Sequence, residues 1–231
     1  MNLADFEKEL KIKFKNPSLL KRALTHRSFL NEAKDKEVVS NERLEFLGDA
    51  ILSFVVSNWI FNEFPKYPEG EMTNLRSNLV KTVTLAKISR KLKVGDYLLL
   101  SKGEKESEGY QKPTLLANTL EAVIGAIFLD QGIEAIERFI KNNFEVLLKE
   151  FVALGNFKDY KSLLQEKLQA QKKKSPVYKT VNEKGPEHNK TFTINVCYQK
   201  SGLIATGVGR SKQKAEQEAA RMALEKLNLK K

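Results

Sequence analysis

Cysteine is almost absent from this chain of 231 residues. The single Cys197 excludes an intramolecular disulfide, and no second cysteine is present to build a thiolate metal site. Residues 1–7 carry acids where a signal peptide needs a basic region and an apolar core. No uninterrupted apolar run has the length of a membrane span, because Asp49 and Asn58 break the longest one. We therefore expect a soluble, cytoplasmic protein that contacts no membrane.

Positive charge is concentrated in the last third of the chain. Residues 1–155 hold 23 Lys and Arg against 22 Asp and Glu, whereas residues 156–231 hold 17 against 7, which is +10 of the overall +11. A field of one sign on a small unit favours a polyanionic partner, either nucleic acid or an anionic membrane surface. The alternative is a lysine-rich surface that contacts only solvent.

The first 150 residues have the periodicity of helices. Pro17 suits a helix start, and a long helix through residues 42–61 ends at the prolines and glycine of residues 64–70. Helical spacing returns over 72–90, 115–129 and 133–151. The polar segment 101–113 is expected to be a flexible loop. No Rossmann or P-loop glycine pattern occurs, and we expect no organic cofactor.

A second unit follows. An amphipathic helix begins at Tyr160, and alternating segments at 177–181, 191–198 and 203–208 indicate three strands. A final helix begins at Ser211. The residues that this helix is expected to bury are Ala215, Ala219, Met222, Ala223 and Leu227. We therefore predict a multidomain fold in which an all-α domain is followed by an α+β domain of order α-β-β-β-α.

Three carboxylates lie at helical spacing inside an otherwise apolar stretch. Glu45 is about 60° from Glu42 around the helix axis, and Asp49 falls between them. Carboxylates are rarely buried without a partner, and aligned acid oxygens suit a divalent cation. A solvated helix face is the alternative, but the helix stays too apolar for a simple surface helix. The apolar residues expected on its opposite, core-facing side are Leu44, Leu47, Ile51 and Phe54.

The same segment carries a family resemblance. Residues 42–50 read Glu-Arg-Leu-Glu-Phe-Leu-Gly-Asp-Ala, which resembles the signature of the ribonuclease III family. The resemblance extends to residues 23–29 and 69–70, and the final unit, including its junction at 207–212, resembles a double-stranded-RNA-binding domain. The domains implied are an endonuclease domain at 1–153, a linker at 154–157 and a double-stranded-RNA-binding domain at 158–229.

The resemblance also implies an activity. Ribonuclease III enzymes are endoribonucleases that hydrolyse double-stranded RNA with metal-activated water, leaving 5′-phosphate and 3′-hydroxyl ends with short 3′ overhangs. They act in rRNA processing and in mRNA processing and turnover, and they are homodimers. Phe46 agrees with a dimer, because it projects from the acid-bearing side, where an apolar ring needs a partner surface.

A second acidic segment completes the expected site. Asn118 and Glu121 are one helical turn apart, so both can point at one place. If their helix packs beside the first, they form an oxygen-rich pocket with Glu45 and Asp49 that suits Mg²⁺, with Mn²⁺ as a substitute. The roles that the family match implies are metal ligands at Glu45, Asp49, Asn118 and Glu121, catalytic groups at Asp49 and Glu121, and supporting acids at Glu42 and Glu69.

No histidine is available as a general base in either acidic segment, which favours metal-activated water as the nucleophile. His26 lies in the family-like segment 25–28, and a structural hydrogen-bonding role is favoured for it.

Asn118 departs from the family pattern, which usually has aspartate there. An amide oxygen can still coordinate a cation, but the site loses a negative charge and gains an NH₂ group. Three explanations stay open: a natural variant that still cleaves, an engineered substitution that traps a complex, or a cleavage-deficient double-stranded-RNA-binding protein. An unrelated basic scaffold that binds ribosomal RNA is a further rival.

Three surfaces of the last domain are expected to contact duplex RNA, which is recognised by shape. Ser211 can cap the final helix, whose amides then favour a phosphate, and Lys212 and Lys214 add cationic donors. His188 lies in the turn that resembles the family loop entering a minor groove. The third surface, one face of the first helix of this domain, consists of Ser162, Gln165 and Gln169.

Gln213 is a second departure, since the family often has consecutive lysines after the serine. Lys214 lies about 200° from Lys212 around the helix, so it does not replace the missing contact. We therefore predict weaker phosphate binding than in the family's strongest pattern, with a shallower salt dependence.

Overall fold

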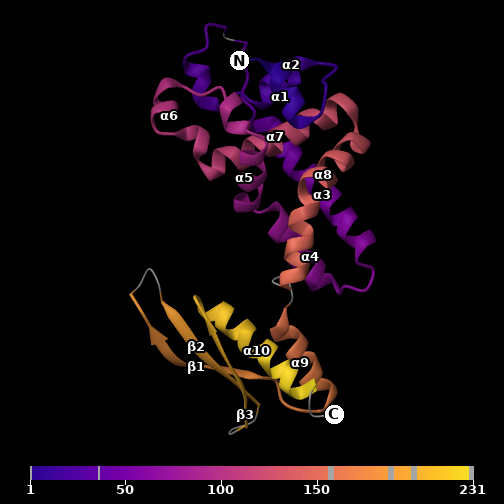
Figure 1. The fold of residues 1–231 in the computed structure, drawn as a ribbon, viewed down its shortest axis with the longest axis vertical. Coiled ribbons are helices and arrows are strands. Elements are labelled where there is room, and N and C mark those ends of the chain that lie inside the picture. The colour runs from indigo at the N-terminus through magenta and orange to yellow at the C-terminus, as the bar shows by residue number, and fades with distance from the viewer. Residues whose placement is uncertain (1, 36, 156–158, 187–189, 199–201, 229–231) are drawn as a thin grey trace. The chain divides into compact units, whose positions relative to one another are not determined.

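The computed structural model describes residues 2–35, 37–155, 159–186, 190–198 and 202–228. The backbone divides into two compact units, Met1–Phe157 and Lys158–Lys231 (Figure 1). The first unit is helical and the second combines a sheet with two helices, which confirms the predicted order of an all-α and an α+β domain. Residues 156 and 157 of the expected linker lie outside the described residues.

The first unit consists of α-helices joined by short turns. The α-helices are α1 (Leu3–Leu10), α2 (Pro17–Ala23), α3 (Glu42–Glu63), α4 (Glu69–Val80), α5 (Thr82–Lys91), α6 (Lys102–Glu106), α7 (Pro113–Gln131) and α8 (Ile133–Leu154). The 3₁₀ helices are η1 (Arg27–Asn31), η2 (Val94–Tyr97) and η3 (Gly109–Gln111). Asn16 caps α2 by accepting a hydrogen bond from the Ser18 amide, and Pro17 occupies its first turn, as expected of a helix start.

Two expectations for this unit are wrong. The segment 101–113 is not a loop, because Ser101 caps α6 and the Lys112 ammonium lies 2.6 Å from the Glu104 carboxylate. The helical periodicity over 72–90 belongs to two helices rather than one. The chain turns at Lys81, whose extended backbone (φ −67°, ψ 149°) separates α4 from α5.

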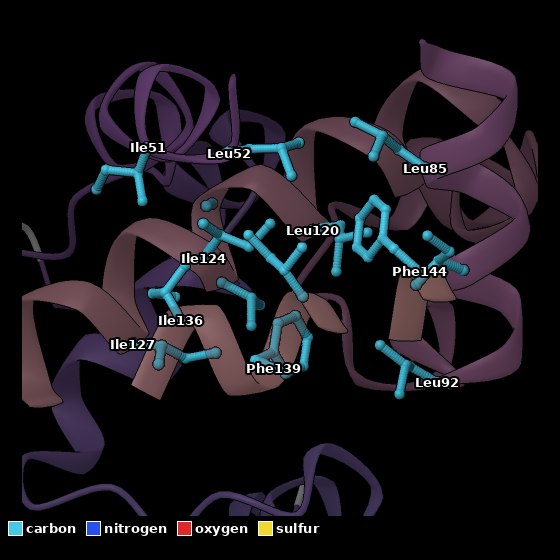
Figure 2. Packing of buried hydrophobic residues seen from close by; sticks show 14 of the residues in the cluster. Ile51, Leu52, Leu85, Leu92, Leu120, Ile124, Ile127, Ile136, Phe139 and Phe144 are labelled. Carbon is cyan, nitrogen blue, oxygen red and sulfur yellow. The ribbon is translucent and has the colours of Figure 1, made fainter. Parts of the chain in front are cut away.

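The core of the first unit is built around α3 and α7. Figure 2 shows Ile51 and Leu52 of α3 in one apolar cluster with side chains of α5, α7 and α8, in which Leu85 and Phe144 lie beside Leu120. Leu44 and Ile51 are buried as predicted, but Phe54 is 61% exposed, so its assignment to the core side is wrong. The buried side of α3 is instead completed by Leu52, Val55 and Val56.

By length and mean hydropathy alone, α3 and α7 would also qualify as membrane spans. Both helices contribute to the core described above, where 39% and 56% of their apolar windows are buried. Their hydropathy is therefore that of core helices packed against each other.

The second unit has the predicted order of elements. These are α9 (Tyr160–Ala170), β1 (Val177–Lys184), β2 (Thr191–Tyr198), β3 (Gly202–Gly209) and α10 (Lys212–Asn228). The strands form an antiparallel sheet of order β1-β2-β3, in which Val177 pairs with Cys197 and Ile194 with Gly207. The first strand extends three residues beyond its predicted end and has a register shift between Thr180 and Asn182.

Small residues let α10 lie directly on the sheet. A Cβ on Gly207 would overlap the backbone of α10 at Ala215 and Ala219, so this approach requires glycine. Ala215, Ala219 and Ala223 are buried as predicted. Met222 and Leu227, which were also expected to be buried, only pack at the margin of this core.

Candidate active site and RNA-binding surface

Acids from two helices line one cleft in the first unit, with a volume of 630 Å³. Glu45 and Asp49 reach it from α3, and Asn118 and Glu121 reach it from α7. The four predicted metal ligands are therefore brought together, as expected if the two helices pack side by side. The remaining lining residues are His26, Arg27, Asn41, Glu42, Phe46, Thr114, Leu115 and Thr119.

Two glycines set the distance between these helices. A Cβ on Gly48 would overlap the carbonyl oxygen of Glu121, and a Cβ on Gly125 would overlap that of Leu44. The backbones of α3 and α7 therefore touch where Asp49 and Glu121 are attached. This contact holds both halves of the site in place, and it was not predicted from the sequence.

Burial and neighbouring charges raise the pKa values of two carboxyl groups in the cleft. Burial, together with the charges of Asp49 and Glu45, raises the pKa of Glu121 to about 7. Burial and then the charge of Glu42 raise the pKa of Glu45, and the hydrogen-bonding side chain of Asn118 opposes this rise. The cleft thus holds more negative charge than its own residues neutralise.

The two predicted supporting acids lie in different places. Glu42 lines the cleft, where it accepts a hydrogen bond from the Ser40 hydroxyl at 2.9 Å and lies 3.6 Å from the Arg27 guanidinium. Glu69 does not line this cleft. It accepts a hydrogen bond from Thr73 at 2.9 Å and borders a separate groove with Phe54 and Phe61.

The oxygen donors of the cleft suit a hard divalent cation. Among the described residues, no three His, Cys, Asp or Glu side chains are grouped as closely as a metal site built only from protein ligands would require. Mg²⁺ does not need such a cage, since it is usually held by one or two carboxylates together with water and substrate phosphate. The three carboxylates and one amide oxygen predicted as ligands lie along this single cleft and fit that requirement.

His26 has the hydrogen-bonding role that its sequence context favoured. It caps η1, with Nδ1 accepting from the Ser28 amide at 3.2 Å. Its position on the wall of the acidic cleft was not predicted. The family resemblance of segment 25–28 marked these residues as noteworthy. Their spacing from the acids, however, did not indicate that His26 lies at the same cleft.

The predicted RNA-binding face of α9 is exposed to solvent. Ser162 and Gln165 border a polar cleft of 490 Å³ that Gln213 of α10 also lines, and Gln169 is exposed one turn further along. The Ser162 hydroxyl donates to Asp159 at 2.8 Å, so part of its hydrogen-bonding capacity is already used. His188 lies outside the described residues.

The start of α10 agrees only partly with its predicted role. Ser211 caps the helix by accepting from the Lys214 amide at 3.2 Å, and the Lys214 side chain is exposed. Lys212 is exposed too, but its ammonium lies 2.9 Å from the Glu183 carboxylate and 5.6 Å from the centre of the Phe192 ring. This pairing with β1 and β2 was not predicted, and it reduces the charge that Lys212 offers to a phosphate.

Comparison with known proteins gives a consistent result. A family model described as ribonuclease-III-like matches residues 16–147, and one for the double-stranded RNA binding motif matches residues 160–227. A protein named ribonuclease 3 from Syntrophotalea carbinolica is 45% identical over 214 residues, and the match covers 93% of this chain and 92% of that protein. Another protein named ribonuclease 3, from Shewanella denitrificans, is 44% identical, and the match covers 98% of this chain and 97% of that protein.

Solved structures agree for the first unit. A nuclease domain of ribonuclease III from Campylobacter jejuni is 42% identical, with a TM-score of 0.57, and the match covers 62% of this chain and 99% of that domain. In that nuclease domain, a region involved in dimer formation is structurally flexible.

An acid-lined helical domain followed by a basic α-β-β-β-α domain defines a nuclease with its own RNA-binding domain. The chain belongs to the ribonuclease III family. It is an endoribonuclease for double-stranded RNA, and its family is generally metal-dependent.

Proposed function

We propose that the 630 Å³ cleft is the cleavage site, with Asp49 and Glu121 as its catalytic groups. The observation that supports this proposal is the convergence of carboxylates from α3 and α7 on one cleft. Glu45, Asp49, Asn118 and Glu121 would hold Mg²⁺, for which Mn²⁺ can substitute, and Glu42 is a supporting acid at the same cleft. Glu69 would act away from it, beside the groove formed with Phe54 and Phe61.

The bound ion would supply the activation of water and the stabilisation of charge on the phosphate. The residues of the chain fix where this happens. The close α3–α7 contact holds Asp49 and Glu121 in register, and the acids attract the cation while repelling a phosphate that arrives without one. The products would be 5′-phosphate and 3′-hydroxyl ends with short 3′ overhangs.

The second unit would deliver the duplex. Ser162, Gln165 and Gln169 on α9, together with His188, Ser211, Lys212 and Lys214, would contact 2′-hydroxyls and phosphates. We further propose rRNA and mRNA as natural substrates, a cytoplasmic location, and domain limits at 1–153 and 158–229 with a linker between them.

A homodimer is the proposed assembly. Phe46, beside the acids, is 81% exposed, and Phe54 and Phe61 are 61% and 65% exposed along a 400 Å³ groove. Large apolar side chains this exposed on one domain favour contact with another protein surface. The nuclease domain from Campylobacter jejuni has a region involved in dimer formation, which supports the same assembly for this chain. A monomeric mass at micromolar concentration in sedimentation analysis would contradict it.

Asn118 favours one alternative form of this proposal, in which a chain of this nuclease family binds duplex RNA but its cleft is deficient in cleavage. The decisive experiment measures cleavage of a duplex RNA by the unchanged chain and by Asn118→Asp, in Mg²⁺ and in Mn²⁺. Product from the unchanged chain in either metal supports the proposal. We expect Asn118→Asp to cleave faster, because an additional negative ligand strengthens cation binding.

Two controls complete this experiment. Glu121→Gln should abolish cleavage and retain RNA binding in a gel-shift assay, whereas full activity in this variant would show that the cleft is not the site. Retained binding with no product in either metal from the unchanged chain would favour the cleavage-deficient alternative.

A further inference from the structure

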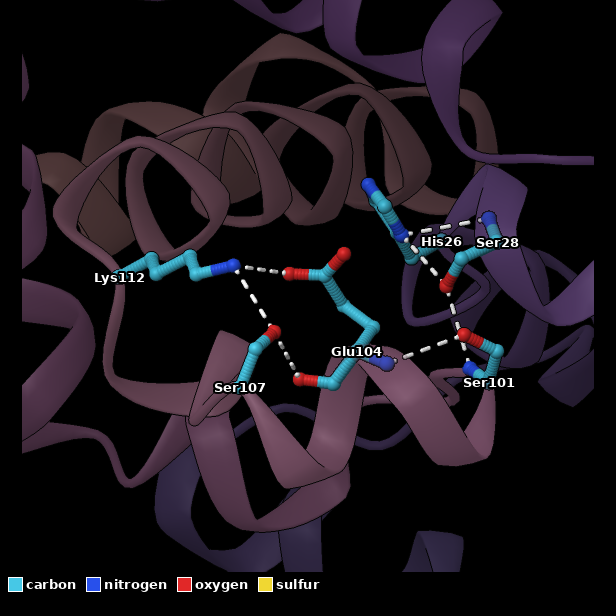
Figure 3. Close-up of polar contacts among 6 residues, drawn as sticks. All are labelled: His26, Ser28, Ser101, Glu104, Ser107 and Lys112. Atoms are coloured by element: carbon cyan, nitrogen blue, oxygen red, sulfur yellow. Dashed lines mark hydrogen bonds and ion pairs between the residues drawn. The ribbon is translucent and has the colours of Figure 1, made fainter.

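The hydrogen bonds around His26 determine which of its ring nitrogens carries the proton. Nδ1 accepts from the Ser28 amide at 3.2 Å and lies 2.9 Å from the Ser28 hydroxyl. That hydroxyl oxygen accepts from the Ser101 amide at 3.1 Å, which leaves its own proton free to point at Nδ1 (Figure 3). With Nδ1 serving as the acceptor, the proton of the neutral ring is on Nε2.

The Nε2–H group is on the side of the ring that the contacts with Ser28 leave free, and the ring belongs to a residue that lines the acidic cleft. His26 is one of the residues that line the cleft, and Figure 3 shows the second ring nitrogen directed away from Ser28. Nε2 makes no hydrogen bond with any of the described residues. Burial lowers the pKa of the ring, with Glu104 opposing and Arg27 reinforcing that change, so the neutral form prevails at physiological pH.

The ring is held in a rigid frame. Ser101, which binds Ser28, also caps α6 by accepting from the Glu104 amide at 3.2 Å. Glu104 in turn lies 2.6 Å from the ammonium of Lys112, the residue directly before α7. The chain of contacts in Figure 3 therefore connects the histidine ring to the start of the helix that carries Asn118 and Glu121.

We propose that His26 is a substrate-contacting residue, whose Nε2–H donates a hydrogen bond to an oxygen of the RNA backbone in the cleavage cleft. The proposal rests on the assignment of this cleft as the cleavage site. In this neutral ring Nε2 already carries the proton and Nδ1 already accepts from Ser28. Neither nitrogen is then available to ligate the cation or to accept a proton from water, so His26 is neither a metal ligand nor a general base. The acceptor is a non-bridging phosphate oxygen or a ribose 2′-hydroxyl next to the scissile bond.

His26→Asn separates this role from a structural one. The Oδ1 atom of asparagine can replace Nδ1 in capping η1, but no group of that side chain reaches the position of Nε2. We expect kcat/KM for duplex cleavage to fall about 10- to 100-fold, the size expected for losing one hydrogen bond to a charged group, while the melting temperature changes little. Full activity of His26→Asn overturns the proposal.

Ser28→Ala is the matched control, since it removes the two hydroxyl contacts, with Nδ1 and with the Ser101 amide, and leaves the Ser28 amide in place to occupy Nδ1. It should lose much less activity than His26→Asn. If His26→Asn lowers the melting temperature, the two variants are compared at a temperature where both are folded. Equal losses of activity there indicate a purely structural role and overturn the proposal.

Modified substrates identify the acceptor. One duplex carries a single 2′-deoxynucleotide beside the scissile bond, and another carries a stereodefined phosphorothioate at it. If the modified group is the acceptor, the unchanged protein cleaves the modified duplex more slowly than the unmodified one. His26→Asn, which has already lost the donor, then cleaves both duplexes at the same rate. Fully additive losses on both duplexes overturn the proposal. Retained cleavage by Glu121→Gln is a different failure, because it rejects the cleft itself.

Discussion

Gly48 and Glu121 touch through their backbones, although they belong to different helices and are 73 positions apart in the sequence. A Cβ at position 48 would overlap the carbonyl oxygen of Glu121. The reciprocal contact, Gly125 against the Leu44 carbonyl, lies one helical turn away on α7. The acids of the cleft therefore stand at the closest approach of α3 and α7, and the glycine within the acidic signature makes that approach sterically possible.

Gly48→Ala should consequently damage both stability and activity. The added methyl group must push α3 from α7, which overpacks the core at a cost of about 1–3 kcal/mol and moves Asp49 relative to Glu121. We expect cleavage to fall more than tenfold. Urea unfolding and a duplex-cleavage assay measure the two effects.

Gly70→Ala provides the control for that variant. Gly70 lies in the first turn of α4, and a Cβ added there would have no neighbouring atom within 4 Å, so alanine fits without contact. It should stabilise the helix by up to about 1 kcal/mol and leave cleavage unchanged. Unaltered stability and activity in Gly48→Ala would contradict the role given to the α3–α7 contact.

The raised pKa of Glu121 predicts how stability depends on pH in EDTA. Burial, Asp49 and Glu45 move this pKa from 4.5 to about 7, so the folded chain binds the proton more tightly than the unfolded chain does. The stabilisation is complete below pH 4.5 and is lost as the pH rises to about 7. We therefore expect Glu121→Gln to raise the melting temperature at pH 8 and to change it little at pH 4.5.

Two further measurements test that explanation. Adding Mg²⁺ should raise the melting temperature of the unchanged protein at pH 8 more than that of Glu121→Gln, because the cation stabilises the carboxylate. Glu145→Gln, outside the cleft, should show no such gain at pH 8, because the neighbouring Lys149 lowers the pKa of Glu145. Equal melting curves for Glu121→Gln and the unchanged protein at pH 8 would show that the Glu121 carboxylate does not destabilise the fold at that pH, and would contradict its raised pKa.

Periodicity predicted the elements of this fold better than it predicted their contacts. The helical spacing of the acids placed Glu45 with Asp49 on one helix face and Asn118 with Glu121 on another. All four line one cleft because α3 and α7 pack together, which the sequence alone supported only as a condition. The same reasoning placed Phe54 on the core side, where it does not lie. An apolar residue on a helix flank can face solvent or a partner, and the sequence of one chain does not distinguish these cases.

Contacts between residues of different helices or strands were the features that the sequence could not reveal. The polar segment 101–113 forms α6 and η3, with Glu104 and Lys112 eight residues apart joined by an ion pair. Lys212 pairs with Glu183 across the second unit. Both pairings depend on how the chain folds back, and neither residue spacing nor composition carries that information.

Gln213→Lys should increase the salt dependence of duplex-RNA binding. Gln213 is exposed and borders the same cleft as Ser162 and Gln165, so a lysine there adds a cation beside the proposed RNA-binding face. The slope of log K against log salt should steepen by about one unit. Leu203→Lys adds the same charge near the start of β3, at the end of this strand opposite to the one that leads into α10. It should change the slope less. An unchanged slope in Gln213→Lys would show that this position does not contact RNA.

Tyr178 carries a hydroxyl that the fold does not use. Its oxygen is buried and has no hydrogen-bond partner among the described residues, and burial, with the charges of Glu216 and Asp159, raises its pKa. The ring itself packs beneath the Lys161 ammonium, 4.8 Å from the ring centre. Because an unpaired buried hydroxyl is costly, Tyr178→Phe should leave the melting temperature of the second unit unchanged or raise it. Tyr178→Leu, which loses the ring, should lower it; a similar loss in Tyr178→Phe would mean that the hydroxyl has a stabilising partner.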